Sequence, residues 1–256
     1  MCQLRAKSVT GAIDGETRVV ALLGHPVSHS LSPRMQNAAF AARGLNWVYV
    51  AFDVEPERVE QAVTGLEALG FAGANVTIPH KRAVALMCDE LDDAAERAGS
   101  VNTLVFRDGR LYGSSTDGLA VAEAIEPAQR AVMLGAGGAA RAVISALEQA
   151  GIDVRVHTRS GDWPPRADDA DLIVNATPVK HELLVEPRGD QQVVDLAYNA
   201  DGSQTALVAA AREAGCAVVV DGLEVLVRQG AASFERWTGL AAPVDVMRAA
   251  VQGGPD

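Results

Sequence analysis

Residues 73–81 of the chain read GANVTIPHK and bring together three side chains that can take part in polar chemistry. Asn75 and Thr77 lie on one side of the alternation in a short apolar segment, and Lys81 follows Pro79 by two residues. An ammonium group can stabilise an oxygen that becomes negatively charged, and it can also supply a proton. Neutral hydrogen-bonding groups beside it can orient the hydroxyls of a bound molecule. This spacing predicts a polar site directly after a buried strand.

Three further polar stretches interrupt the apolar segments of the first half, and they read SHSLSP, SVNT and STDG. Each places Ser, Thr, Asn or Asp at a predicted strand end or turn. Polar side chains that converge at strand ends can bind a small polyol or acid. The same residue types also cap helices and form turns. For each stretch taken alone, both interpretations stay open.

A glycine motif in the second half predicts a dinucleotide site. In VMLGAGGAA, Gly135, Gly137 and Ala140 follow an apolar strand and open an apolar helix, in the order G-x-G-x-x-A. The first glycine permits a tight turn, the second lets the backbone approach a pyrophosphate, and the small third residue allows close helix packing. The amides at the helix start can then hold the phosphate charge.

The end of the next strand indicates which dinucleotide is bound. An NAD site usually has Asp or Glu there, about 20 residues after the glycines, to bind the ribose hydroxyls. Here the strand ends in VRVHTRS, with Arg159 and no carboxylate. A guanidinium group pairs with an anionic 2′-phosphate, so the sequence favours NADP. The alternative is that Arg159 is an exposed loop cation, as most arginines are.

Composition excludes several other classes of protein. The chain has 256 residues, of which 48% are hydrophobic, and its net charge of −11 argues against a nucleic-acid or anionic-membrane surface. Cys2, Cys88 and Cys216 lie far apart, so we expect no disulfide or zinc site and a reduced, cytoplasmic setting. We expect no membrane span, because no apolar run approaches about 20 residues. The five histidines lack metal-ligand spacing, and we expect no metal.

The order of strand and helix patterns predicts an α/β fold. Strands and helices alternate in the first half, and a hairpin at RDG closes it. At the start of one helix, Ser32 is the expected N-cap and Pro33 the first helical residue. From about residue 117, strands alternate with helices, which predicts a parallel sheet with right-handed crossovers. Two helices are expected at the end.

Eight motifs, taken in order, resemble the shikimate dehydrogenase family from residue 19 to about residue 251. They read GHPVSHSLSP, GANVTIPHK, SVNTL, STDG, LGAGGAARAV, NATPV, VVDLAYN and LVRQGAASFERWTG. The resemblance implies a two-domain α/β enzyme with a cleft between its domains. Residues 1–116 and 238–256 would form the substrate-binding catalytic domain, and residues 117–237 a Rossmann-type NADP-binding domain. The implied reaction is the reversible reduction of 3-dehydroshikimate to shikimate by NADPH.

The resemblance also implies residue roles. Lys81 and Asp117 match the catalytic acid-base pair. The implied substrate contacts are Ser30, Ser32, Asn75, Thr77, Asn102, Tyr198 and Gln229. The implied cofactor contacts are Gly135, Ala136, Gly137, Gly138, Ala139, Thr158, Arg159, Ser160, Ala176, Thr177 and Gly222.

Three departures from the family pattern leave the substrate open. Ser115 stands where the family usually has Asn, and Gln36-Asn37 looks more like the quinate/shikimate branch. Lys180 stands where glycine is usual, and we expect it to be solvated rather than to touch phosphate or nicotinamide. The alternatives are a quinate/shikimate or aminoshikimate dehydrogenase, which could use NAD, and a non-catalytic NADP-binding sensor. A sensor would be expected to lose Lys81 or Asp117. A monomer or homodimer is expected.

Overall fold

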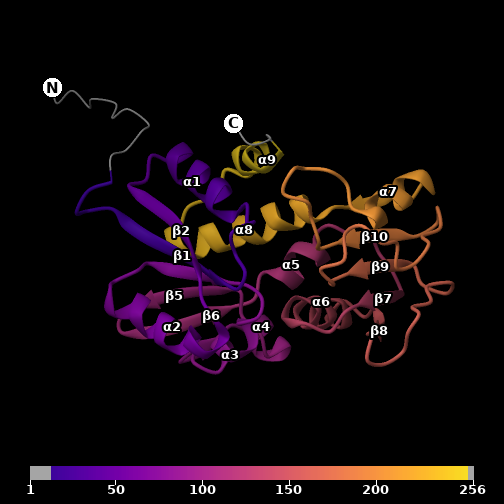
Figure 1. The fold of residues 1–256 in the computed structure, drawn as a ribbon, viewed down its shortest axis with the longest axis horizontal. Coiled ribbons are helices and arrows are strands. Elements are labelled where there is room, and N and C mark those ends of the chain that lie inside the picture. The colour runs from indigo at the N-terminus through magenta and orange to yellow at the C-terminus, as the bar shows by residue number, and fades with distance from the viewer. Residues whose placement is uncertain (1–12, 253–256) are drawn as a thin grey trace.

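The computed structural model describes residues 13–252 and divides them into two α/β halves that lie side by side (Figure 1). The first half contains a six-stranded mixed sheet in the order β2-β1-β3-β5-β6-β4. Its strands are β1 (Arg18–Gly24), β2 (Trp47–Asp53), β3 (Gly73–Val76), β4 (Glu90–Leu91), β5 (Thr103–Arg107) and β6 (Arg110–Ser114). β1 pairs in parallel with β2 and β3, whereas β5 is antiparallel to β3 and β6.

Both faces of the first sheet are covered, and the central strand shows why. In β1, Val20 and Leu22 enter one hydrophobic core, while Ala21 and Leu23 enter a second core on the opposite face. A strand buried on both faces must be apolar throughout, which explains the run RVVALLG. The helical elements of this half are α1 (Ser32–Ala42), η1 (Pro56–Arg58), α2 (Val59–Ala68), α3 (Lys81–Ala85) and α4 (Asp93–Ala98).

Two local predictions in this half have different outcomes. The hairpin between β5 and β6 is confirmed, and its turn residues Asp108 and Gly109 have φ angles of 54° and 68°, as a tight hairpin turn requires. The prediction that Ser32 is the N-cap of α1 is wrong. Leu31 holds the cap position without a side-chain bond, and the backbone N–H of Ser32 donates to Oγ of Ser30 (3.2 Å) instead. The helix therefore begins one residue earlier.

The second half confirms the predicted parallel sheet. Its five strands run in the order β11-β10-β9-β7-β8, and every pairing is parallel. They are β7 (Arg130–Leu134), β8 (Asp153–His157), β9 (Leu172–Asn175), β10 (Gln192–Asp195) and β11 (Val218–Val220). The helices α5 (Asp117–Ala122) and α6 (Gly138–Gln149) pack on one face and α7 (Ala206–Glu213) on the other. The predicted α/β class is confirmed.

The helix α8 (Gly222–Thr238) crosses between the halves, and α9 (Val244–Gln252) follows it (Figure 1). Val225 packs in a core of the second half, but Val227, Phe234 and Trp237 pack in a core of the first. The indole N–H of Trp237 donates to the carbonyl of Leu104 in β5 (2.9 Å). The predicted limits of the domains remain a prediction. This packing argues for moving most of α8 into the substrate domain.

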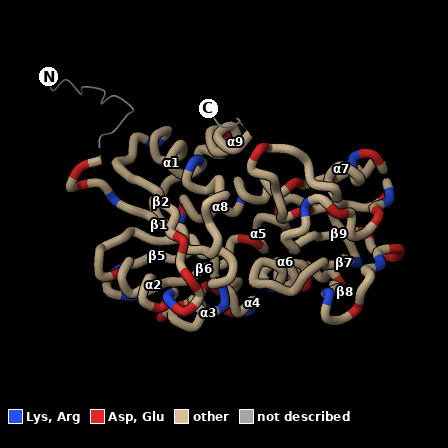
Figure 2. Tube along the Cα trace, viewed as in Figure 1, with Lys and Arg blue, Asp and Glu red and all other residues tan. Residues whose placement is uncertain are grey.

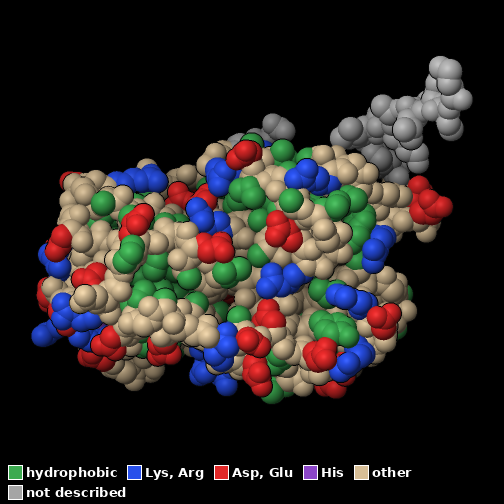
Figure 3. All heavy atoms as spheres, turned by 180° about the vertical axis from the view of Figure 1, so that it is seen from behind, with side chains coloured by type: hydrophobic (Ala, Val, Ile, Leu, Met, Phe, Trp, Pro, Cys, Tyr) green, Lys and Arg blue, Asp and Glu red, His purple; other side chains and the backbone are tan. Residues whose placement is uncertain are grey.

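Charged residues of both signs are mixed along the backbone of both halves (Figure 2). The face opposite to the view of Figure 1 shows the same mixture, with apolar side chains between the charges (Figure 3). Within residues 13–252, no helix combines the length and the apolar composition needed to cross a bilayer. Residues 1–12 and 253–256 of the predicted substrate domain, Cys2 among them, lie outside the described part of the chain.

Candidate active site

A cavity of about 430 Å³ lies between the two halves and collects side chains from both. Its walls come from the ends of β1, β3 and β10, from the loop after β9, and from α8. All nine predicted catalytic and substrate residues line it, namely Ser30, Ser32, Asn75, Thr77, Lys81, Asn102, Asp117, Tyr198 and Gln229. The tertiary structure therefore brings together residues that are far apart in the sequence, such as Ser30 and Gln229, which are separated by 199 positions.

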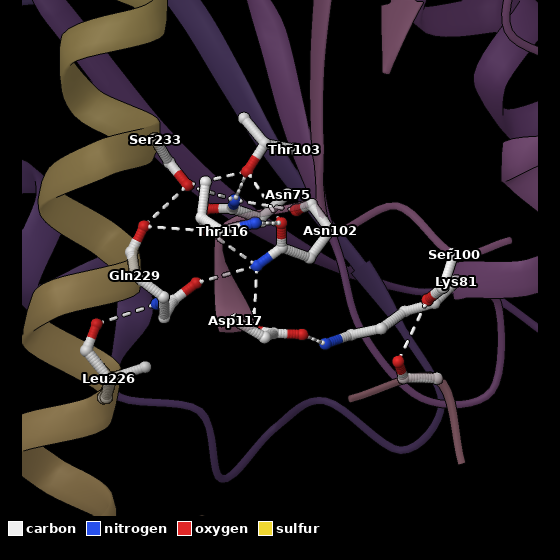
Figure 4. Close-up of polar contacts among 11 residues, drawn as sticks. Asn75, Lys81, Ser100, Asn102, Thr103, Thr116, Asp117, Leu226, Gln229 and Ser233 are labelled. Atoms are coloured by element: carbon white, nitrogen blue, oxygen red, sulfur yellow. Dashed lines mark hydrogen bonds and ion pairs between the residues drawn. The ribbon is translucent and has the colours of Figure 1, made fainter. Parts of the chain in front are cut away.

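Lys81 and Asp117 form an ion pair inside this cavity (Figure 4). Lys81 is the first residue of α3, and Asp117 is the first residue of α5. Their Nζ and Oδ2 atoms are in direct contact, and each side chain is 10% exposed. A buried ammonium that a carboxylate holds in position can act as a general acid.

Asn102 holds the carboxylate in place. Its Nδ2 group donates to Oδ1 of Asp117 (2.8 Å) and to Oγ1 of Thr116 (2.8 Å), and it lies 3.3 Å from Oε1 of Gln229. Its Oδ1 atom accepts the backbone N–H of Thr116 (2.9 Å). With both ends of its amide bonded, Asn102 has a defined orientation. The hydrogen bond from Asn102 to Asp117 supports the ion pair from the protein side. The sequence did not indicate this contact.

Asn75 is also bonded mainly to the protein (Figure 4). Its Nδ2 group donates to the carbonyl of Asn102 (2.9 Å), to Oγ of Ser233 (3.0 Å) and to Oγ1 of Thr103 (3.2 Å). Its Oδ1 atom accepts the hydroxyl of Tyr49 (2.8 Å). Asn75 thereby joins β2, β3, β5 and α8 beneath the cavity. Tyr49, Thr103 and Ser233 were missed by the sequence reading, because no local pattern marks a buried polar partner.

Hydroxyl groups from both halves meet at another wall of the cavity. Burial raises the pKa of Tyr198, while hydrogen bonds from the backbone of Leu31 and the side chain of Ser30 oppose this shift. Burial likewise raises the pKa of Tyr49, which a hydrogen bond from Ser32 opposes. These contacts connect the two predicted serines to two phenols that stay protonated at neutral pH. Ser30, Ser32 and Tyr198 line the cavity with neutral hydroxyl groups, whereas Tyr49 does not line it and donates its hydroxyl to Asn75.

The glycine turn adjoins the ion pair. Gly135 has φ of +108°, a conformation that favours glycine, and Gly137 caps α6. A Cβ atom added to Gly138 would lie 2.9 Å from Cβ of Lys81 and 2.9 Å from Oγ of Ser100, so no side chain fits there. The start of α6 is therefore packed against Lys81, so the amide groups of this helix start lie close to the ion pair.

The predicted cofactor residues divide into two groups. Ala139, Ala176, Thr177 and Gly222 line the cavity, whereas Gly135, Ala136, Gly137, Gly138, Thr158, Arg159 and Ser160 do not. Ala136 lines a second cavity, of about 630 Å³, together with Arg141 and Val156. The side chain of Arg159 is 69% exposed, and its NH2 lies 3.9 Å from Oε2 of Glu182. An exposed guanidinium with so long a contact is accessible to an anion.

The departures from the family pattern have different outcomes. Ser115 is buried, donates its backbone N–H to Oδ1 of Asp92 (3.3 Å) and does not line the cavity. The expectation that Lys180 is solvated stays a prediction. Lys180 is half-buried, lines the cavity, and has its Nζ 5.9 Å from the ring centroid of Tyr198. Within residues 13–252, no group of three His, Cys, Asp or Glu side chains could hold a metal ion.

Two family profiles match the chain. Residues 22–104 match the profile described as the shikimate dehydrogenase substrate binding domain. Residues 222–252, which form α8 and α9, match the profile described as the shikimate 5'-dehydrogenase C-terminal domain.

Individual proteins are similar over almost the whole length. A protein of Methanopyrus kandleri named shikimate dehydrogenase (NADP(+)) is 44% identical, over 95% of this chain and 98% of its own. The solved shikimate dehydrogenase of Aquifex aeolicus is 33% identical with a TM-score of 0.87, covering 94% of this chain and 100% of that one. The shikimate 5-dehydrogenase of Thermus thermophilus, solved in complex with NADP(H) and shikimate, is 34% identical with a TM-score of 0.82, covering 92% and 98%.

Proposed function

We propose, since the chain belongs to the shikimate dehydrogenase family, that it catalyses the reversible reduction of 3-dehydroshikimate to shikimate with NADPH. The observation that carries this proposal is the buried ion pair of Lys81 and Asp117 in a cavity between two α/β halves. A non-catalytic sensor would not need this pair, and its presence argues against that alternative.

The chemistry follows from the position of the ammonium group. Bound NADPH supplies the hydride. When the ketone is reduced, negative charge develops on its oxygen, and a donor must stabilise that charge and deliver a proton. Lys81 donates this proton, and in the reverse direction it accepts the proton of the alcohol. Asp117 keeps the ammonium in the cavity, and Asn102 keeps Asp117 in place through its 2.8 Å hydrogen bond.

The cofactor fits the glycine turn of the second half. Gly135 and Gly137 leave the backbone free to approach a pyrophosphate, and the start of α6 offers its amide groups. Arg159 is our candidate for the 2′-phosphate, because its guanidinium is exposed at the end of β8. The remaining residues that the resemblance implied as cofactor contacts stay proposed contacts of NADP.

The substrate contacts are also proposals. Ser30, Ser32 and Tyr198 would bind the acid group, while Thr77 and Gln229 would contact ring hydroxyls. Asn75 and Asn102 line the same cavity, but their hydrogen bonds support the wall more than they offer free donors. A cytoplasmic location and a monomeric or homodimeric state stay predictions.

Steady-state kinetics with three acids would test the function. We expect the highest kcat/KM with shikimate and NADP, and lower values with quinate, with an amino analogue, and with NAD in place of NADP. A preference for quinate or the amino analogue would move the protein to a specialised branch of the same chemistry. Absence of turnover with every acid and either cofactor would overturn the proposal.

Replacing Arg159 with aspartate would test the cofactor assignment. We expect the KM for NADPH to rise about tenfold or more, because the guanidinium is lost and a carboxylate repels the 2′-phosphate. The KM for NADH should change little, since NADH carries no such phosphate. Equal changes for both cofactors would show that Arg159 does not read this group.

A further inference from the structure

Lys180 enters the cavity from the second half of the molecule, on the loop that follows β9. Its side chain lines the cavity beside Tyr198, with Nζ 5.9 Å from the ring centroid, which is within the range of a cation–π contact. Tyr198 in turn is hydrogen-bonded by the side chain of Ser30. An ammonium, a phenol and a serine hydroxyl therefore lie along one wall.

The backbone that carries Lys180 is anchored. Its carbonyl accepts the N–H of Ala206 at the start of α7 (2.7 Å). At the start of the loop, Oδ1 of Asn175 accepts the backbone N–H of Thr177 (3.0 Å). Nδ2 of Asn175 donates to Oδ1 of Asp195 (2.8 Å). These bonds tie the loop to β10 and α7. A side chain on an anchored loop can be placed reproducibly.

Asp195 supports the same loop from inside the core. It is fully buried, and its Oδ2 accepts the hydroxyl of Thr205, the N-cap residue of α7 (2.5 Å). Its Oδ1 also accepts the backbone N–H of Ala197, just before Tyr198 (2.9 Å). One buried carboxylate thus supports both Lys180 and Tyr198, so the distance between these two side chains depends on a shared scaffold.

The charges of the cavity leave Lys180 without an acidic partner. Lys81 is paired with Asp117, and His25 lies 2.5 Å from Oδ1 of Asp53. Among the residues that the structure describes, no acidic side chain forms an ion pair with Lys180. Because Lys81 and Asp117 cancel each other, the ammonium of Lys180 adds a positive charge to the cavity that no carboxylate balances. A positive cavity lined with hydroxyl donors suits an anion.

We propose that Lys180 binds the carboxylate of the substrate, together with Ser30 and Tyr198, and selects acids over neutral ring alcohols. The inference rests on the proposed function, because it assigns Lys180 to the substrate of that reaction. A hydrogen bond to a charged group contributes more than one between neutral groups. When a site loses a hydrogen bond to a charged group, the ligand that carries this group binds more weakly, while a ligand without it is affected less. Lys180 acts in recognition, whereas Lys81 acts in proton transfer.

The test compares Lys180→Gln with the wild-type enzyme on shikimate and on its uncharged methyl ester. For shikimate we expect KM to rise about ten- to a hundredfold, with kcat and the KM for NADP changed less than about twofold. For the methyl ester, the two proteins should have nearly equal kcat/KM. Lys180→Arg should recover part of the preference for the acid, and added salt should reduce it.

Arg212→Gln is a matched control, since it removes a positive charge from an exposed ion pair of α7 with Asp221. It should leave the ratio of acid to ester unchanged. The proposal for Lys180 is overturned if Lys180→Gln lowers kcat/KM equally for the acid and the ester, or if it raises only the KM for NADP. If the wild-type protein turns over no acid, the proposed function fails instead. In that case, calorimetric titration with shikimate tests the role of Lys180 in binding. Equal affinities of the wild-type protein and Lys180→Gln for shikimate would overturn that role.

Discussion

Replacing Lys81 with methionine is expected to lower kcat by about three orders of magnitude, within the range that a general acid contributes. Methionine fills similar space but cannot donate a proton or stabilise the developing oxyanion. The KM for shikimate should change much less, because Ser30, Ser32 and Tyr198, which also line the cavity, are unchanged. Steady-state kinetics in both directions, with purified protein and NADP(H), would measure both parameters.

A structural control is needed, because the substitution leaves the buried Asp117 without its cation. Thermal unfolding and NADP binding should be measured on the same preparation, and Lys81→Arg, which keeps the charge, provides a second variant. If both variants bind NADP normally and have little activity, the loss lies in the chemistry. A methionine variant with more than about a tenth of the wild-type kcat would remove Lys81 as the acid.

The change of Asp117 to asparagine is expected to lower kcat by about two orders of magnitude. The carboxylate now accepts from Lys81 at Oδ2 and from Asn102 at Oδ1. An amide has only one oxygen, so its NH2 group must face one of these two donors. Lys81 or Asn102 then loses its acceptor, and the ammonium is no longer held towards the substrate. Substrate KM should again change less than kcat.

The double variant Lys81→Met/Asp117→Asn distinguishes a pair from two independent groups. If Asp117 acts by positioning Lys81, its substitution should cost little more once Lys81 is gone, and the double variant should resemble Lys81→Met. Losses that multiply would instead mean that Asp117 has a separate role in turnover. The same four proteins, compared at one pH with saturating shikimate and NADP, complete the cycle.

The sequence by itself determined the local features and, through ordered motifs, the family. Short-range patterns predict the glycine motif, the alternation of strands and helices after residue 117, and the hairpin at Asp108 and Gly109. They do so because turn conformations and strand periods depend on neighbouring residues. The family resemblance is confirmed by relatives of 44–45% identity. The candidate pair of Lys81 and Asp117 came from that resemblance rather than from any spacing.

Only the tertiary structure decided which of these polar groups touch each other. The inward bonding of Asn75 depends on Tyr49 and Ser233, which are 26 and 158 positions away. The approach of Lys180 to Tyr198 depends on the shared support of two loops by Asp195. The folded geometry and the degree of burial determine which distant partners an amide or an ammonium group contacts. Local sequence periodicity encodes neither the geometry nor the burial. For the same reason, the packing of most of α8 against the first sheet could be seen only once the chain was folded.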